Sequence, residues 1–556
     1  MELPQDPTII PQARRYETTF AAIQGRAFQE KDQITINIPQ IDKTYLTKNV
    51  KLHFKFNLKY YESTPETLTA LVTALGNTNA QTFFSAESST VRAFTKPIPT
   101  FDINGPYGLI NRIQVYSYLN NTLLEDIPQH DLLTAQFADI WLKNDILDID
   151  RPYIADTGPV VDQLASSYGG VTTSFQHMMR KQPCANIYGE NTNIYSTGWN
   201  GTYASNTFTR NQCSVTMEYS LDLFSFLGRF SDKFVPLHNG FKIVLTLNDF
   251  SKAIKFNTAY GNCLTFFMNS SGNTEGILLT PYLNGSTISN VYLKAELLEV
   301  SPELDDKVDK MVYTTSWKYQ QDFFPYVDFT KSGTYVANVN REPFRRRILP
   351  DLRSITKVYV GQRPAFQNKT FGRQELGYRL RNYTKGGKLL FNKTEVATIA
   401  STREAWQMYQ KHFVVAPDMY LRWSDFNLDE DDINGTEGNQ FNVPGYSFLN
   451  RSTTEKNSFA WFAGYAGIVN AAGSSVTGAF TSRYSTLSQG RFLLCFNTRI
   501  PGAVGNSVAG IDTSKAILEY ELTPENDVCQ KVNIDVFIEH DSFIHVDPGK
   551  STSVTF

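Results

Sequence analysis

The sequence places its most reactive side chains together near residue 540. The run IEHDSFIH contains His540 and His545, with Glu539 and Asp541 on either side of the first histidine. Histidines and carboxylates are zinc ligands when they converge on one point. The run has the composition of a strand, however, and side chains an odd number of residues apart in a strand point to opposite faces. We therefore expect solvated or hydrogen-bonded histidines here rather than a metal site.

A second candidate is the acidic segment Asp425 to Glu437 (DFNLDEDDINGTE), in which carboxylates recur at short intervals. A calcium-binding EF-hand loop needs glycine at its sixth position, but this segment has Glu430 there and glycine only at Gly435. A solvated acidic loop is the favoured interpretation, with an irregular calcium site as the alternative.

Two further patterns suggest binding rather than catalysis. Arg345, Arg346 and Arg347 are consecutive, and such a run either binds phosphate or, more commonly, is solvated or paired with acids. Trp199, Trp423 and Trp461 lie in polar surroundings, where exposed rings could stack on sugars. Aromatic residues of a β-sandwich more often belong to its core.

Motifs of common enzyme classes are absent from the sequence. It has no HExxH, GxSxG or GxxxxGK[ST] motif, and no GxGxxG after a strand. Its five cysteines are odd in number, widely spaced and without a CxxC pair, which favours neither disulfides nor zinc and suggests synthesis in a reducing compartment. The sequence therefore predicts no catalytic residue, no cofactor, no metal site and no enzyme activity.

The overall charge argues against nucleic acid as a direct partner. Lys and Arg number 52 against 55 Asp and Glu, giving a formal net charge of -3. No global basic field is therefore available to attract phosphate, and we expect no sequence-specific binding to nucleic acid. The N-terminus lacks the pattern of a signal peptide, and no run of about 18 apolar residues occurs.

The elements that position these residues are mainly strands. Residues 51 to 60 (KLHFKFNLKY) alternate polar and apolar without a break, so one face of the expected strand is apolar and must be covered by another sheet. Phe and Tyr are abundant, at 39 and 29, while charged residues make up only 19%, which is typical of half-buried sheets. Similar alternation occurs at residues 34 to 38, 215 to 221, 243 to 247, 291 to 297, 517 to 522 and 534 to 538.

Two segments have helical spacing instead. Residues 128 to 142 place Leu132, Leu133, Phe137, Ile140 and Trp141 on one face, with Asp126 as the expected N-cap. Residues 394 to 413 place Val396, Ile399, Trp406, Tyr409 and Phe413 in a similar way. Each half of the chain is therefore expected to insert a helix among its strands.

The length of 556 residues predicts two large domains. Residues 1 to 30 contain three prolines and little alternation, which predicts an extended arm. A charged stretch at 301 to 310 (SPELDDKVDK) suggests a boundary near residue 305, giving domains 31–305 and 306–556. Long polar insertions, such as 62 to 92, 166 to 212 and 435 to 452, suggest loops that make contacts in an assembly.

The order of these patterns resembles the double jelly-roll major capsid proteins of tailless icosahedral double-stranded DNA viruses, which include PRD1-like phages, virophages and adenovirus-like hexons. Residues 101 to 142 are similar to the family's β-hairpin that leads into a helix. Residues 217 to 249 and 291 to 310 resemble the late strands and exit of a first jelly roll, and residues 345 to 362 resemble an early part of a second.

The resemblance implies an all-β fold of two tandem eight-stranded jelly-roll sandwiches with long loops and a few short helices. It implies a capsid protein of the virion, made in the host cytoplasm or a virus factory, whose homotrimers tile an icosahedral shell. The implied partners are other trimers, penton and minor capsid proteins, and an internal membrane that would face Arg14, Arg15 and the Arg345 to Arg347 run. The alternative is a glycan-binding β-sandwich adhesin or receptor-binding spike.

Overall fold

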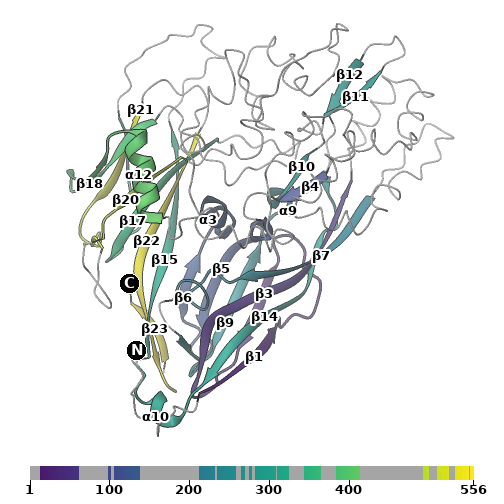
Figure 1. Cartoon of the computed structure of the whole chain (residues 1–556), viewed down its shortest axis with the longest axis vertical. Helices are drawn as coiled ribbons and strands as arrows, with labels where there is room; N and C mark the ends of the chain where they lie inside the picture. The colour runs from purple at the N-terminus through teal and green to yellow at the C-terminus, as the bar shows by residue number, and fades with distance from the viewer. Residues whose placement is uncertain are drawn as a thin grey trace, which may run out of the picture.

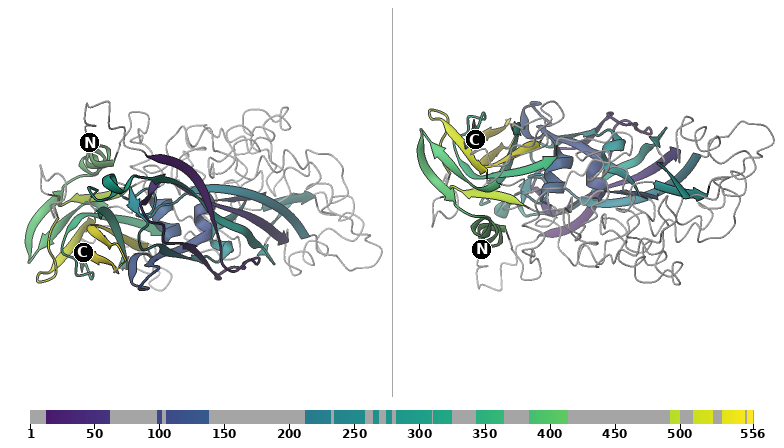
Figure 2. Two further views of the ribbon diagram at one scale, coloured as in Figure 1. Left: turned by 90° about the horizontal axis from the view of Figure 1, so that it is seen from below. Right: turned by 90° about the horizontal axis from the view of Figure 1, so that it is seen from above.

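The computed structural model describes residues 13–61, 98–101, 105–137, 212–231, 234–257, 264–268, 274–278, 282–308, 310–324, 343–364, 384–413, 492–499, 510–524, 532–549 and 551–555. Most of the strands in these ranges belong to two β-sandwiches, which follow one another along the chain and lie side by side (Figures 1 and 2). Every strand pair in these sandwiches is antiparallel.

The first sandwich, called the first roll below, has two facing sheets. One has the order β1 (Arg14–Ala21), β14 (Thr287–Glu299), β3 (Thr44–Tyr61), β7 (Gln212–Asp222), with the short strands β8 (Val235–Pro236) and β13 (Tyr282–Leu283) also paired to β3. The other has the order β2 (Gln33–Ile38), β9 (Phe241–Leu247), β5 (Ile110–Ser117), β6 (Leu123–Ile127).

The second roll repeats this plan. One sheet has the order β15 (Met311–Phe324), β22 (Val532–Asp547), β17 (Ile355–Pro364), β20 (Leu493–Asn497), with β23 (Ser551–Thr555) paired to β22. The other has the order β16 (Phe344–Arg347), β21 (Leu518–Pro524), β18 (Thr384–Phe391), β19 (Thr394–Ile399).

The two rolls have the same topology. When the eight sandwich strands of each roll are ranked along the chain, the sheets of both rolls read 1-8-3-6 and 2-7-4-5. This order is that of a jelly roll, and the prediction of an all-β chain with two eight-stranded jelly rolls is therefore confirmed. Each roll also has a helix directly after its fifth strand.

Several short elements complete the described residues. They are η1 (Gly105–Leu109), α3 (His130–Gln136), α9 (Phe250–Ala253), α10 (Pro302–Asp305) and α12 (Thr402–Phe413), with the strand pairs β4 (Ile98–Phe101) with β10 (Ile254–Asn257) and β11 (Leu264–Met268) with β12 (Thr274–Leu278). Among the described residues, no helix has the length and hydropathy needed to cross a bilayer.

The alternating segment at residues 51 to 60 lies in β3, at the centre of its sheet. Its apolar face is buried, with exposed fractions of 4% or less, and consists of Leu52, Phe54, Phe56, Leu58 and Tyr60. The intervening polar residues are only partly buried on the outer face. All seven segments predicted as strands from their alternation lie in strands, except that β21 begins at Leu518 and leaves Ile517 outside.

The helix after β6 is shorter than predicted and begins differently. Asp126 is not its N-cap: it lies in β6, where its carboxylate accepts two hydrogen bonds of 2.7 Å from Arg112. Gln129, in a left-handed conformation (φ 52°), occupies the N-cap position, so α3 begins at His130. Leu132, Leu133 and Phe137 are buried as predicted, while Ile140 and Trp141 lie outside the described residues.

The second predicted helix begins later than residue 394. Residues 394 to 399 form β19, because Asn392 and Lys393 both take positive φ values (49° and 68°) and close a tight hairpin with β18. The helical prediction for this part was therefore wrong: Val396 and Ile399 do not share a buried face, because Val396 is exposed and Ile399 is buried. Helix α12 covers only Thr402–Phe413.

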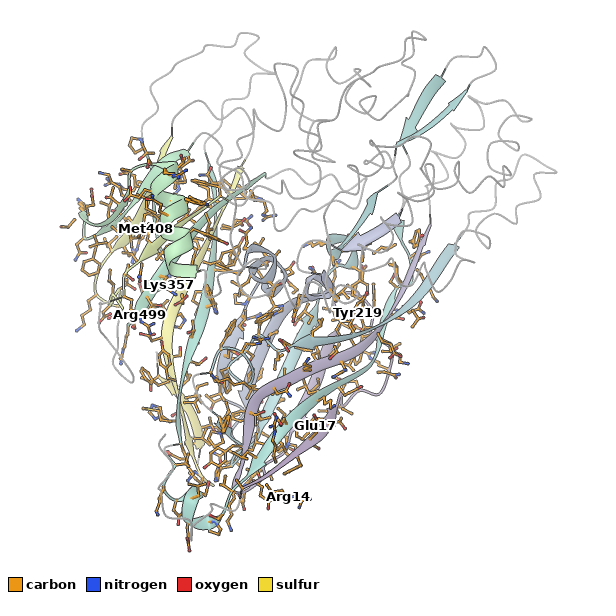
Figure 3. The ribbon with its side chains drawn as sticks, in the orientation of Figure 1. Arg14, Glu17, Tyr219, Lys357, Met408 and Arg499 are labelled. Carbon is orange, nitrogen blue, oxygen red and sulfur yellow. The ribbon has the colours of Figure 1, made fainter. Side chains whose placement is uncertain are left out.

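The predicted arm contains a strand. Residues 14 to 21 form β1, the edge strand of the first sheet, and Figure 3 shows Arg14 and Glu17 along it. The alternation is weak in sequence because most of its side chains are exposed and only Phe20 is buried. The described part of this segment therefore belongs to the first roll rather than extending away from it.

The first prediction tests the core of β3. Phe56→Ala should lower the free energy of unfolding by about 3–5 kcal/mol, because Phe56 is fully buried and packs on Phe250 with ring centroids 5.3 Å apart. Lys55→Ala, next to it on the outer face, removes only an ion pair with Glu218 and should cost about 1 kcal/mol or less. Chemical denaturation measures both, and equal losses would contradict the assigned faces.

Candidate functional site

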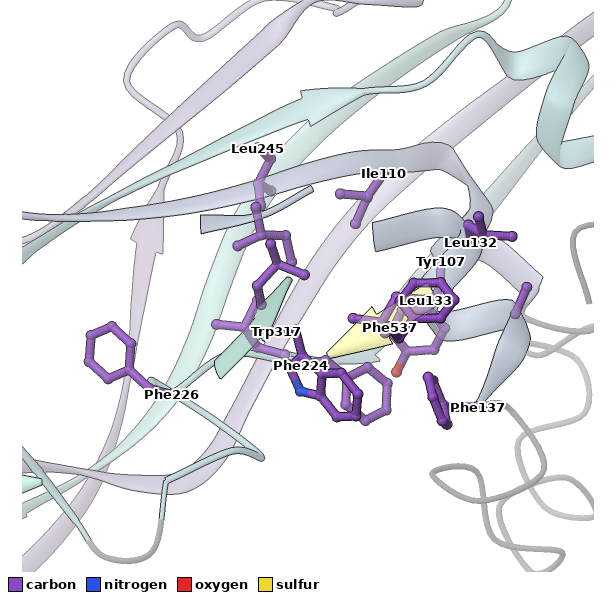
Figure 4. Packing of buried hydrophobic residues seen from close by; sticks show 14 of the residues in the cluster. Tyr107, Ile110, Leu132, Leu133, Phe137, Phe224, Phe226, Leu245, Trp317 and Phe537 are labelled. Carbon is purple, nitrogen blue, oxygen red and sulfur yellow. The ribbon is translucent and has the colours of Figure 1, made fainter. Parts of the chain in front are cut away.

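The described residues that hold the two rolls together form the candidate site, which we call the seam. Its centre is aromatic (Figure 4). Phe137 lies just after α3 in the first roll. Its ring centroid is 5.2 Å from that of Trp317, 4.9 Å from that of Tyr359 and 5.7 Å from that of Phe537, and these three residues belong to the second roll. Each such pair contributes about 0.5–1.5 kcal/mol beyond burial of its area. The centre of the seam is therefore a packed aromatic contact.

The connection between the rolls is fixed by a buried polar cluster. Asp305, at the end of α10, accepts hydrogen bonds from the Tyr45 hydroxyl and, at 3.1 Å, from His238 Nε2. Lys310 Nζ lies 3.5 Å from the same carboxylate. Burial acts to raise the pKa of Asp305, but the hydrogen bonds from Tyr45 and His238 lower it below its usual value. Asp305 is therefore held as a carboxylate between the two rolls.

Asn239, which follows His238 in the sequence, forms hydrogen bonds with the C-terminal hairpin of the second roll. Its side-chain amide donates to the carbonyl oxygen of Asp547 at 2.8 Å and to Thr552 Oγ1 at 3.1 Å, and its Oδ1 accepts from the Gly549 N–H at 3.0 Å. Gly240 follows with φ +63°, and a Cβ there would lie 2.7 Å from the Ile38 carbonyl oxygen. The turn of the first roll that contains His238 and Asn239 therefore binds both the linker, through Asp305, and the C-terminal hairpin of the second roll.

A buried carboxyl group supports the segment that contacts β15. Glu125 of β6 accepts hydrogen bonds from the Ser225 hydroxyl and the Phe226 N–H. Burial raises the pKa of Glu125 to about 8, so the folded protein holds it protonated at neutral pH. The segment it anchors reaches the second roll at Phe230, whose carbonyl oxygen accepts from Thr314 Oγ1 at 3.2 Å, and at Ser231, which bridges to Thr314.

Buried ion pairs stiffen the second roll beside the seam. Arg363 Nε donates to Asp535 at 2.9 Å, and both side chains are almost fully buried. Although burial lowers the pKa of Arg363, Asp535 raises it above the usual value. Glu539 accepts from Lys357, Thr356 and Tyr359, with distances of 2.8 to 3.1 Å. Breaking such a buried pair leaves an uncompensated charge, so these groups fix the register of β22 against β17.

Comparison with known proteins gives similarity in structure alone. No family model matches the chain, and no curated protein matches it in sequence. A chain of the Sputnik virophage structure matches with a TM-score of 0.51 and 10% identity, covering 100% of this chain and 93% of that one. The chain is a double jelly roll. The resemblance in the sequence is thus confirmed as a likeness of fold.

Two further solved structures match over similar lengths. The mavirus major capsid protein has a TM-score of 0.46 and 9% identity, covering 97% of this chain and 90% of that one. The Faustovirus major capsid protein has a TM-score of 0.47 and 9% identity, with coverages of 98% and 93%.

The histidines examined in the sequence do not form a site in the double jelly roll. His540 is buried in β22, and burial lowers its pKa to about 4. Its neighbours act structurally, since Glu539 binds Lys357, and Asp541 accepts from Ser354 and Tyr313. Within the described ranges, no group of three or more His, Cys, Asp or Glu residues is placed to bind a metal ion.

The basic residues are mostly paired within the chain. Arg345 donates to Glu521 at 2.7 Å, Arg347 lies 3.8 Å from Asp351, and the Arg346 guanidinium lies 4.4 Å from the Phe344 ring centroid. On β1, Arg15 forms an ion pair with Glu296. The acidic segment 425 to 437 and Trp199, Trp423 and Trp461 lie outside the described residues.

Sequence reasoning did not identify the polar residues of the seam. Asp305 and Tyr45 are 260 positions apart, and no local pattern connects them. Two local signals were present, however. Ser301 followed by Pro302 is typical of a helix start, and Asn239-Gly240 is typical of a tight turn.

The second prediction concerns Asn239. Asn239→Ala should lower the free energy of unfolding by about 1–3 kcal/mol, because it removes three hydrogen bonds to the C-terminal hairpin, one of them to the buried hydroxyl of Thr552. Hydrogen exchange should rise first in residues 543 to 555. Asn49→Ala, at an exposed position, is the matched control and should change neither quantity. Unchanged protection of the hairpin would show that Asn239 does not hold it.

The third prediction concerns pH. Folding raises the pKa of Glu125 from 4.5 to about 8. The protonated group therefore contributes its full stabilisation below pH 4.5, and this contribution is lost as the pH rises through the folded pKa. The wild type should therefore lose stability between pH 4.5 and about pH 8 relative to Glu125→Gln, which cannot ionise. Thermal unfolding of both proteins across this range measures the difference, and parallel curves would contradict it.

Proposed function

We propose that the chain is the major capsid protein of an icosahedral virus, and that its homotrimers tile the shell. The observation that carries the proposal is that two jelly rolls of identical topology, joined by a packed seam, make up the described chain. The same fold extends over the full length of the match to the Sputnik virophage chain. Three such subunits present six similar rolls and therefore a nearly hexagonal outline.

The proposal assigns no chemistry to the chain. The candidate catalytic carboxylates among the described residues are used in structure, as Glu539 and Asp541 illustrate. A role in assembly requires a rigid subunit with extensive surfaces instead, and the packed seam supports such rigidity. We further propose that the domains divide near residue 305, where α10 connects the rolls, and that the protein resides in the virion.

Finer features of the proposed shell follow from the same role. Trimers would meet through weak lateral contacts, which allow errors in assembly to be corrected reversibly. Penton and minor capsid proteins would complete the shell, and the paired state of Arg345 supports a structural task for that arginine rather than one on an internal membrane. Production would take place in the host cytoplasm or a virus factory.

The fourth prediction is the mass of the native protein. The purified chain should scatter light as a trimer of three times 62.9 kDa, and negative-stain images should show particles with a hexagonal outline. The adhesin alternative predicts no such outline. A protein that remains monomeric under native conditions across a range of concentrations would overturn the proposed function.

A further inference from the structure

Two Asn-Gly dipeptides lie wholly within the described residues, and the fold places them in opposite surroundings. They are Asn239-Gly240 and Asn284-Gly285. Asparagine before glycine is prone to spontaneous deamidation, because glycine has no side chain to shield its backbone nitrogen from the neighbouring amide carbon. The reaction requires that this nitrogen and the side-chain amide are both free and in contact with water.

The pair at Asn284 lies in a bulge on the first roll. Strands β13 and β14 both pair with β3, and residues 284 to 286 interrupt them opposite Lys59. The bulge is held at both ends, since the Asn284 N–H donates to the Lys59 carbonyl oxygen at 3.0 Å and Ser286 Oγ accepts from the Lys59 N–H at 2.9 Å. The backbone of the bulge is therefore anchored on β3.

The reacting groups of this pair are accessible. Asn284 and Gly285 are both exposed, Gly285 has a φ of +75°, and a Cβ there would have only Lys59 Cδ within 4 Å, at 3.9 Å. Among the described residues, none accepts a hydrogen bond from the Gly285 N–H, and none forms one with the Asn284 side-chain amide. Water can therefore reach both the nitrogen and the amide.

The pair at Asn239 is enclosed. The Asn239 side chain is fully buried, and its amide donates two hydrogen bonds to the C-terminal hairpin and accepts one from it. The Gly240 N–H donates to the Leu237 carbonyl oxygen at 3.1 Å. Before its nitrogen can attack, Gly240 must lose this proton to a base from solvent, and the buried site excludes solvent. Both reacting groups are thus held in other bonds.

We propose that Asn284 is a site of spontaneous deamidation in the folded chain, and that the fold protects Asn239 from the same reaction. Hydroxide removes the proton of the Gly285 nitrogen, which attacks Cγ of Asn284 and closes a succinimide ring. The Cγ–Nδ2 bond breaks, and the leaving nitrogen takes a proton from water and departs as ammonia. Water then opens the ring at either carbonyl, which leaves aspartate or isoaspartate, and nothing is oxidised or reduced.

The product adds a negative charge beside a lysine. Lys59 borders the bulge, so it attracts a carboxylate at position 284. Isoaspartate also lengthens the backbone by a methylene group, at a point where Gly285 leaves open space. The first roll therefore tolerates the modification. A carboxylate at position 239, by contrast, could not donate to Asp547 or Thr552, so protection of Asn239 preserves the attachment of the C-terminal hairpin.

The fifth prediction follows both pairs by peptide mass spectrometry of the full chain, kept for days in neutral buffer with or without unfolding concentrations of urea. Trypsin releases Asn239 in residues 234 to 242 and Asn284 in residues 256 to 294. In buffer, deamidation should accumulate at Asn284 and be about tenfold or more slower at Asn239, which becomes accessible only when buried hydrogen bonds open. In urea the two rates should converge. Asn290, exposed but followed by valine, is the matched control in the same peptide as Asn284 and should remain unmodified.

Gly285→Asp tests the route of the reaction. Aspartate tolerates a positive φ, and its side chain shields the attacking nitrogen, so deamidation of Asn284 should slow while Asn239 behaves as in the wild type. An unchanged unfolding temperature shows that the variant is folded. Equal rates at Asn239 and Asn284 in buffer, modification of Asn284 only in urea, or an unchanged rate in Gly285→Asp would overturn the inference. None of these results depends on the mass of the native protein, so the proposed function is tested separately.

Discussion

The structure depends on a carboxylate held between two domains. Asp305 is placed by a one-turn helix in the linker, and its acceptors are filled by Tyr45 and His238, both from the first roll. Displacing this carboxylate would leave a buried charge without its hydrogen bonds. Asp305 therefore fixes the linker against the first roll, and the aromatic cluster around Phe137 makes the contact between the two rolls.

The same turn also restrains the far end of the chain. Asn239 follows His238 directly, and its three hydrogen bonds reach the hairpin between β22 and β23. The second roll is thus attached to the first at its beginning and at its end. A sandwich attached at only one point could rotate about its linker, whereas two attachments to one rigid turn remove that freedom. This double attachment restrains the second roll more than either contact would alone.

The sequence was sufficient to predict the strands whose two faces differ in polarity. β3 is the clearest case, since water on one side and the core on the other impose strict alternation. β1 escaped prediction because most of its side chains are exposed and only Phe20 is buried, and β19 was taken for a helix because Val396 and Ile399, three residues apart, fit a helical period. The seam lay beyond sequence reasoning for a different reason. Tyr45 and Asp305 are joined only by the fold, and Glu125 reveals its role only once Ser225, 100 positions away, lies beside it.

Duplication explains which surfaces remain for assembly. Two rolls of one topology carry two copies of every surface, and the seam uses Phe137 of the first roll and the face of the β15–β22–β17 sheet of the second. The outer sheet faces are occupied by ion pairs within the chain, such as Lys55 with Glu218 and Arg345 with Glu521, and exposed pairs of this kind are solvated and contribute little. At the counterpart positions, β1 exposes Arg15, Glu17 and Thr19, and β19 exposes Thr394, Glu395 and Val396.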